Sequence, residues 1–66
     1  MEFAKRLAQL MKENKISQEV LAKEIGYSQR AVSKWINGQS EPCATAIISC
    51  AKFFDVSTDY ILGVID

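Results

Sequence analysis

Residues 18–37 read QEVLAKEIGYSQRAVSKWIN, and this stretch decides the fold of the 66-residue chain. Apolar residues recur at helical spacing over 18–25 and again up to Asn37, with only a few residues between the two runs. Gly26 suits a helix end because glycine adopts the left-handed conformation without a Cβ clash. Ser28 suits the start of the next helix because its hydroxyl can accept a hydrogen bond from a backbone N–H. Two helices joined by so short a turn must cross steeply and in close contact.

The side chains of this stretch fit such a crossing. Ala22 is small at the middle of the first helix, where a larger residue would hold the second helix away. Leu21, Ile25, Val32 and Trp35 form the shared apolar seam. With a small fifth residue, a glycine at the ninth position and apolar residues at the fourth, eighth, fifteenth and eighteenth, the stretch resembles a helix-turn-helix motif. Trp35 is interpreted as a core residue and not as a base-stacking one, because its spacing from Val32 places it on the seam.

The flanking sequence predicts three further short helices. Apolar residues at helical spacing indicate a helix over 2–14, and Ser17 is expected to cap the helix at 18–25. Residues 38–42 collect turn formers and the only proline, which predicts a loop. A helix over 44–54 follows, weakly capped by Cys43, and its expected buried face is Ala44, Ile47, Ile48, Ala51 and Phe54. Ser57 and Gly63 bound a short helix at 58–62. With no convincing strand, the predicted fold class is all-α with five helices.

The chain lacks the residues that several functional classes of protein require. No apolar run approaches the roughly 18 residues of a membrane span, and we expect neither signal peptide nor anchor. Cys43 and Cys50 lie seven residues apart in or beside a predicted helix, roughly 10 Å along its axis, which is too far for a disulfide. Without a histidine or a CxxC pair we expect no metal or other cofactor, and two inert, half-buried thiols in a reducing cytoplasm. The sequence contains no phosphate-binding loop and no activated nucleophile, so we do not expect an enzyme.

The resemblance to a known family rests on segments spread over nearly the whole chain. KISQEVLA at 15–22, SQRAVSKW at 28–35, NG at 37–38, EP at 41–42 and DVSTDYILG at 55–63 follow the phage repressor and Cro-like family, of the xenobiotic-response-element type. The resemblance implies one lambda-repressor-like DNA-binding domain over residues 1–66. It also implies a bacterial or phage transcriptional regulator, with repression favoured, that binds double-stranded operators as a homodimer with the second motif helix in the major groove.

The resemblance assigns roles to nine residues around the motif. The first-turn side chains of the second motif helix would meet base edges, with Gln29 suited to adenine and Arg30 to guanine, and Ser33 and Lys34 one turn further along. Gln18 would bind phosphate and steady the first reading residue. The loop of Asn37, Gly38, Gln39 and Ser40 would contact phosphate through backbone and side chains.

Two further features of the family bear on this chain. Many members carry an internal Arg–Glu ion pair where Met11 and Ile36 stand here, and we expect these two apolar side chains to touch instead. The chain end is more apolar than one short helix can bury, which predicts a dimer interface. Its expected residues are Tyr60, Ile61, Leu62, Val64 and Ile65. The alternative is that this end packs on its own core.

The net charge of zero conceals a polarity along the chain. Residues 1–40 contain seven basic and four acidic side chains, a balance of +3, whereas residues 41–66 contain one basic and four acidic, a balance of −3. The basic residues expected in or near the DNA-facing half are Lys5, Arg6, Lys12, Lys15, Arg30 and Lys34. The acidic residues expected to face away are Glu41, Asp55, Asp59 and Asp66.

Two other functions remain open at the level of sequence. The same five helices could form a protein-interaction module, such as an antitoxin or antirepressor partner. DNA binding is favoured because an interaction helix should expose apolar anchors, where the second motif helix exposes polar and basic side chains. The chain could also be the amino-terminal DNA-binding domain of a longer regulator.

Overall fold

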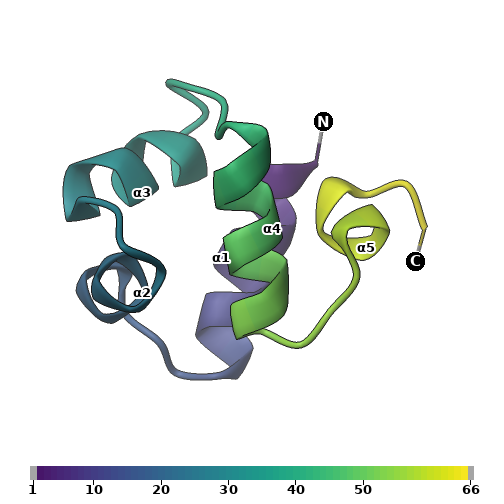
Figure 1. Cartoon of the computed structure of the whole chain (residues 1–66), viewed down its shortest axis with the longest axis horizontal. Coiled ribbons are helices and arrows are strands. Elements are labelled where there is room, and N and C mark those ends of the chain that lie inside the picture. Colours follow the sequence, from purple (N-terminus) through teal and green to yellow (C-terminus); the bar gives the residue numbers. More distant parts are fainter. Residues whose placement is uncertain (1, 66) are drawn as a thin grey trace.

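The computed structural model describes residues 2–65, so Met1 and the acidic Asp66 lie outside it. Its helices are α1 (Phe3–Glu13), α2 (Gln18–Ile25), α3 (Gln29–Ile36), α4 (Ala44–Phe53) and α5 (Thr58–Leu62), shown in Figure 1. No strand occurs among the described residues. The all-α prediction is confirmed, with each helix within one residue of its expected bounds. None of these helices has the length and apolar character needed to cross a membrane.

Three serines start helices in the same way. Each adopts an extended backbone conformation and accepts a hydrogen bond from the backbone N–H three residues later. The bonds join Ser17 to Val20 at 3.1 Å, Ser28 to Ala31 at 3.1 Å and Ser57 to Tyr60 at 3.0 Å. Each satisfies one backbone donor that the first helical turn leaves without a partner. Cys43 precedes α4 without such a side-chain bond, in line with its weak capping ability.

Left-handed residues end the helices, but only some of them are glycines. Gly26 follows α2 with a φ of 79°, whereas Lys15 and Asp55 adopt φ angles of 55° after α1 and α4. The next backbone N–H folds back in both cases, from Ile16 to the Met11 oxygen at 2.8 Å and from Val56 to the Ala51 oxygen at 2.9 Å. These bonds satisfy carbonyls at the helix ends, so the conformation persists despite its steric cost to a side chain.

Replacing Lys15 with glycine is expected to raise the free energy of unfolding by roughly 0.5–1 kcal/mol. The left-handed conformation costs a side chain about 1–2 kcal/mol, and the extra freedom of glycine in the unfolded chain returns part of that gain. Asp55→Gly should stabilise less, because aspartate tolerates this conformation better than lysine. Urea unfolding of both variants measures the difference. A lower midpoint for Lys15→Gly than for the wild type would contradict it.

The core lies where all five helices meet. Its fully or nearly fully buried side chains are Phe3, Leu7, Leu10, Met11, Leu21, Ala22, Val32, Trp35, Ala46, Cys50, Ala51 and Ile61. The interpretation of Trp35 as core is therefore confirmed. Met11 is buried and Ile36 packs half-buried against the same cluster, and direct contact between these two side chains remains a prediction.

The expected buried face of α4 is wrong in part. Ala44 and Ile48 are exposed, Ile48 by 46%, and Ile47 and Phe54 are only half-buried. The buried side chains are Ala46, Cys50 and Ala51, which are all small. Apolar residues lie on nearly every side of α4, so their spacing did not select a face. Small residues instead let α4 approach α2 and α5, the helices against which it packs.

The helix pair expected from the sequence is formed by α2 and α3, which pack closely against each other (Figure 1). Ala22 is buried in the middle of α2, as its small size requires in such a pair, and Gly26 opens the turn between the two helices. Because α1 packs against both α3 and α5, it connects the helix pair to the other end of the molecule. Helix α3 is thereby held on one side by α2 and on another by α1.

The two cysteines are free thiols, as expected, but they are not alike. The prediction that both are half-buried is wrong, because Cys50 is buried in the core and Cys43 is exposed at the start of α4. Burial raises the pKa of the Cys50 thiol to about 11. The Tyr27 hydroxyl lies 3.4 Å from the Cys43 sulfur, and this contact, with backbone N–H groups of α4, lowers the pKa of Cys43.

Iodoacetamide is therefore expected to alkylate Cys43 at neutral pH and to leave Cys50 unmodified until the chain unfolds. Thiolates are the reacting species, and the Cys43 pKa is lowered whereas the Cys50 pKa is raised. Mass spectrometry of the two cysteine-containing peptides over a pH series measures both rates. In Tyr27→Phe the hydroxyl is lost, so the onset of Cys43 alkylation should move to higher pH. Equal rates at the two cysteines in the folded chain would contradict the prediction.

Candidate nucleic-acid interface

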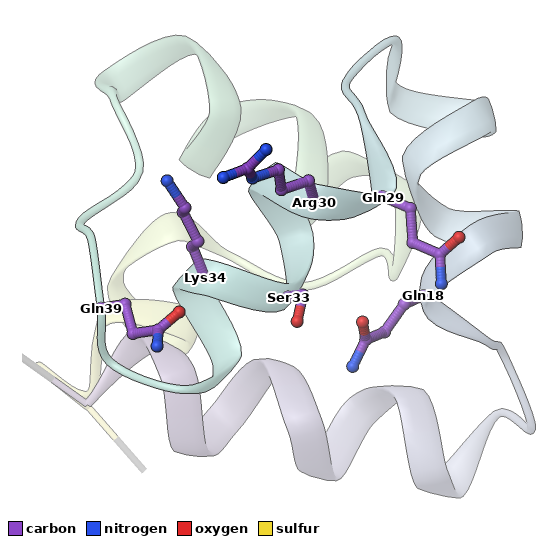
Figure 2. Close-up of a pocket in the computed structure, with 6 residues that line it drawn as sticks. All are labelled: Gln18, Gln29, Arg30, Ser33, Lys34 and Gln39. Atoms are coloured by element: carbon purple, nitrogen blue, oxygen red, sulfur yellow. The ribbon is translucent and has the colours of Figure 1, made fainter.

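An open hollow on the surface brings together residues from three segments of the chain. Its lining consists of Gln18, Gln29, Arg30, Ser33, Lys34 and Gln39. They come from the first turn of α2, from one face of α3 and from the loop that follows it (Figure 2). All four residues predicted to read bases line the hollow, together with two of the residues predicted to contact phosphate. Asn37, Gly38 and Ser40 are exposed but do not line it.

The side chains of the hollow are polar or positively charged. Arg30 and Lys34 are exposed cations, and no acidic side chain of the described residues lines the hollow. Gln18 and Gln29 lie at one end of the hollow, where the Gln18 side chain extends toward Ser33, and Lys34 and Gln39 lie at the other end (Figure 2). Carboxamides can both donate and accept hydrogen bonds, and guanidinium and ammonium groups donate. The hollow therefore presents hydrogen-bonding groups of both kinds beside positive charge.

Aromatic packing beneath the hollow holds α3 in place, which the sequence reasoning missed. Trp35 contacts Phe3 of α1 and Tyr27 of the turn, with ring centroids 6.2 Å and 5.3 Å apart and both pairs edge to face. Such aromatic pairs contribute packing energy beyond their buried area. The spacing of apolar residues within each helix predicts that Phe3 and Trp35 are both buried, but it does not predict that they contact each other. These contacts join α1, the turn and α3, so they hold α3 against the core with its opposite face exposed.

The loop after α3 uses its own backbone donors internally. The N–H of Asn37 donates to the Ser33 carbonyl oxygen at 3.0 Å, and the N–H of Gly38 donates to the Trp35 carbonyl oxygen at 3.2 Å. The N–H groups of Gln39 and Ser40 both donate to the Lys34 oxygen, at 2.9 and 3.4 Å. The Asn37 side chain also contacts the Ser33 hydroxyl at 3.4 Å. Contacts of this loop with a ligand therefore depend on its side chains.

The structure corrects the expected position of Arg6. Its guanidinium carbon lies 4.6 Å from the centroid of the Tyr60 ring, a cation–π contact between α1 and α5. Arg6 therefore belongs to the side of the molecule that α5 covers and not to the hollow. Its inclusion in the DNA-facing half was wrong because helical position along α1, and not distance along the chain, decides which side a residue faces.

The predicted dimer residues differ in their exposure. Val64 and Ile65 are 69% and 50% exposed, and Tyr60 and Leu62 are half-buried. The inclusion of Ile61 is wrong, because its side chain is fully buried in the core of its own chain. Exposed apolar surface at this end is thus limited to residues around and after the end of α5.

Comparison with known proteins decides the family. The helix-turn-helix family matches residues 7–61, from α1 into α5. The chain belongs to this family. The resemblance to its phage repressor and Cro-like, xenobiotic-response-element type is confirmed, and this family is one of DNA-binding regulators and not of enzymes.

Two curated bacterial proteins are similar to this helix-turn-helix chain over almost its whole length. The HTH-type transcriptional activator BcrR of Enterococcus faecalis is 37% identical over 63 residues, which make up 96% of this chain and 31% of that protein. An HTH-type transcriptional regulator of Bacillus subtilis strain 168, YobD, is 34% identical over 64 residues, or 97% of this chain and 57% of that protein. The chain thus spans between 31% and 57% of the length of these relatives.

Two solved structures share the fold. The nuclear magnetic resonance structure of the DNA-binding domain of the P22 C2 repressor has a TM-score of 0.85 and is 32% identical, covering 91% of this chain and 79% of that one. The crystal structure of the P22 c2 repressor in complex with a synthetic operator has a TM-score of 0.84 and is 30% identical, covering 89% of each chain. These likenesses confirm the lambda-repressor-like fold class.

Proposed function

We propose that this chain binds double-stranded DNA sequence-specifically as a DNA-binding domain of a transcriptional regulator, with α3 in the major groove. The observation that carries the proposal is the hollow, which gathers hydrogen-bonding and basic side chains of α2, α3 and the following loop on one exposed face. It is supported by the fold shared with the P22 c2 repressor, which is bound to a synthetic operator in its crystal structure. The similar proteins include an activator and a repressor, so the proposal concerns operator binding, the step that both require.

Base reading is assigned to the exposed face of α3. The Gln29 carboxamide matches the N6 and N7 groups of adenine, and the Arg30 guanidinium matches O6 and N7 of guanine. Lys34 can donate to guanine, and Ser33 can donate to or accept from a base edge. Gln18, the first residue of α2, lies at the same end of the hollow as Gln29 and would bind phosphate and hold Gln29 in place (Figure 2).

Phosphate contacts would come from side chains that surround the hollow. Asn37 and Ser40 are exposed next to it and offer their side chains, whereas the N–H of Gly38 is bonded to the Trp35 carbonyl oxygen, so Gly38 serves to let the loop lie close to the DNA. Lys5, Lys12 and Lys15 add positive charge along α1 and its end. Because each neutralised phosphate releases counterions, binding should weaken as salt rises, with a shallower slope than that of a strongly basic protein.

We include a homodimer in the proposal, formed through Tyr60, Leu62, Val64 and Ile65. Exposed apolar side chains gather at this end, and two copies related by a two-fold axis would each cover the other. Their α3 helices would then meet half-sites roughly 34 Å apart, one turn of DNA. Sedimentation equilibrium should show dimers at high protein concentration, and Ile65→Asp should abolish them. A wild-type chain that stays monomeric throughout would remove the dimer from the proposal.

A protein-interaction module is the other candidate function, and the face of α3 argues against it. Interaction helices expose apolar or aromatic anchors, whereas Gln29, Arg30 and Lys34 are the exposed side chains of this face. We therefore propose DNA as the partner, and the cytoplasm of a bacterium or phage-infected cell as the place of action.

Selection of bound sequences from a random pool of DNA duplexes tests the proposal. The expected result is one enriched motif with two-fold symmetry, bound more tightly than unrelated DNA and more weakly as salt rises. Fluorescence anisotropy with the enriched duplex and a shuffled duplex measures the difference. Equal affinity for the two duplexes, or no binding to either at low salt, would overturn the proposed function.

A further inference from the structure

We infer that Gln39 reads a base edge, at the end of the half-site opposite to that read by Gln29, and does not serve as a phosphate contact. This inference rests on the proposed function and changes the role that the family resemblance gives to Gln39. It adds a specificity-determining residue from outside α3.

The first observation is where Gln39 lies. It lines the same hollow as Gln29, Arg30, Ser33 and Lys34, whereas its neighbours Asn37, Gly38 and Ser40 do not. In Figure 2 its carboxamide lies beside Lys34, at the far end of the hollow from Gln18 and Gln29. A ligand that occupies the hollow and meets the α3 side chains would therefore meet Gln39 as well.

The second observation is that the backbone holds Gln39 in a defined position. Gly38 adopts a φ of 72°, which turns the chain back on the last turn of α3. The N–H of Gln39 then donates to the Lys34 oxygen at 2.9 Å, and the N–H of Ser40 converges on the same oxygen. Gln39 is thus fixed relative to Lys34 almost as if it belonged to α3. Base reading requires such a position, because a side chain on a mobile loop would lose its geometric preference.

The third observation concerns the chemistry that is left to Gln39. Its backbone N–H is already bonded within the chain, so the carboxamide is the only group through which Gln39 can donate a hydrogen bond to DNA. A carboxamide can donate to a phosphate, as proposed for Gln18, but only a base edge uses both its donor and its acceptor, and these match the N6 and N7 groups of adenine. The place of Gln39 in the hollow and its fixed backbone favour contact with a base edge, and its carboxamide favours adenine as that base.

The test compares Gln39→Ala with Ser40→Ala, a neighbouring exposed residue outside the hollow. Each variant of the 66-residue chain is selected on the random duplex pool, and its affinity is measured for the wild-type duplex and for single-base variants of it. Gln39→Ala is expected to lose preference at one base pair and to bind the wild-type duplex about 5- to 150-fold more weakly, the range of one bidentate base contact. Ser40→Ala removes a proposed phosphate contact, so it should weaken binding to every duplex alike and keep the whole motif. Gln29→Ala should lose preference at the other end of the half-site.

Gln39→Glu provides a second measurement because it preserves size while removing the donor. It should disfavour adenine and favour cytosine at the same base pair, since a carboxylate accepts from the cytosine N4 group. Uniform weakening on every duplex by both variants, or no change in the selected motif, would overturn the inference while leaving the proposed function intact. Absence of any motif for the wild-type chain would overturn the proposed function, and the inference with it.

Discussion

Replacing Trp35 with alanine is expected to leave the chain unfolded or only marginally stable. Removal of a buried tryptophan costs about 3–5 kcal/mol through lost burial and the cavity left behind. A chain of 66 residues has a total stability of roughly 3–10 kcal/mol, so this single change removes much or all of it. Trp35 contacts both Phe3 and Tyr27, and its loss would remove the aromatic contacts that join α3 to α1 and to the turn.

Circular dichroism during urea unfolding measures this effect. Trp35→Phe keeps an aromatic ring in the core and should cost less than Trp35→Ala. Val20→Ala is the control, because Val20 is an exposed apolar residue on α2 and its replacement should change stability by under about 0.5 kcal/mol. If Trp35→Ala unfolded cooperatively with a loss below about 1 kcal/mol, Trp35 would not be the centre of the core, and the burial argument would be wrong.

The ends of the helices could be predicted from the sequence because local chemistry decides them. Ser17, Ser28 and Ser57 each satisfy a backbone donor within their own helix, and Gly26 needs no neighbour to adopt its conformation. Such preferences act over three or four residues and can be read without knowing the fold. The left-handed conformation of Lys15 could not be predicted from the sequence, because a lysine side chain does not favour that conformation.

Features that depend on which helices meet could not be read in this way. Ala46 and Cys50 form the buried side of α4 because α2 and α5 approach it there, although Ile48 is more apolar than either. Arg6 lies over Tyr60 because α1 and α5 pack together, a contact between residues far apart in the chain. Helical spacing identifies a face only when polar residues mark its opposite side, and α4 has few of them.

The residues that line the hollow could be predicted from the sequence only in part. The α3 side chains that line it share a helix face, so their spacing predicts that they lie together. Gln18 joins them because α2 and α3 cross as the motif predicts. Gln39 joins them through the turn at Gly38, whereas its neighbours Asn37 and Ser40 do not, and the spacing of residues in a loop carries no such distinction. The sequence could assign this loop one shared role, but the structure separates its members.

Replacing Arg30 with alanine is expected to weaken binding to the selected operator by about 1–3 kcal/mol and to relax preference at one base pair. Arg30 is exposed in the first turn of α3 and lines the hollow, where its guanidinium can form two parallel hydrogen bonds to one guanine. Arg30→Lys keeps the charge but not the planar fork, so it should recover the salt dependence without recovering the base preference. Selection and anisotropy at two salt concentrations measure both quantities.

Lys52→Ala is the matched control, because it removes one positive charge from the exposed surface of α4, outside the hollow. It should leave the selected motif unchanged and alter affinity only slightly, by an amount that vanishes as salt rises. If Arg30→Ala instead weakened binding equally on all duplexes and reduced the salt slope by about 1, Arg30 would be a phosphate contact. The base preference at that end of the half-site would then have to come from Gln29, the neighbouring side chain at the start of α3.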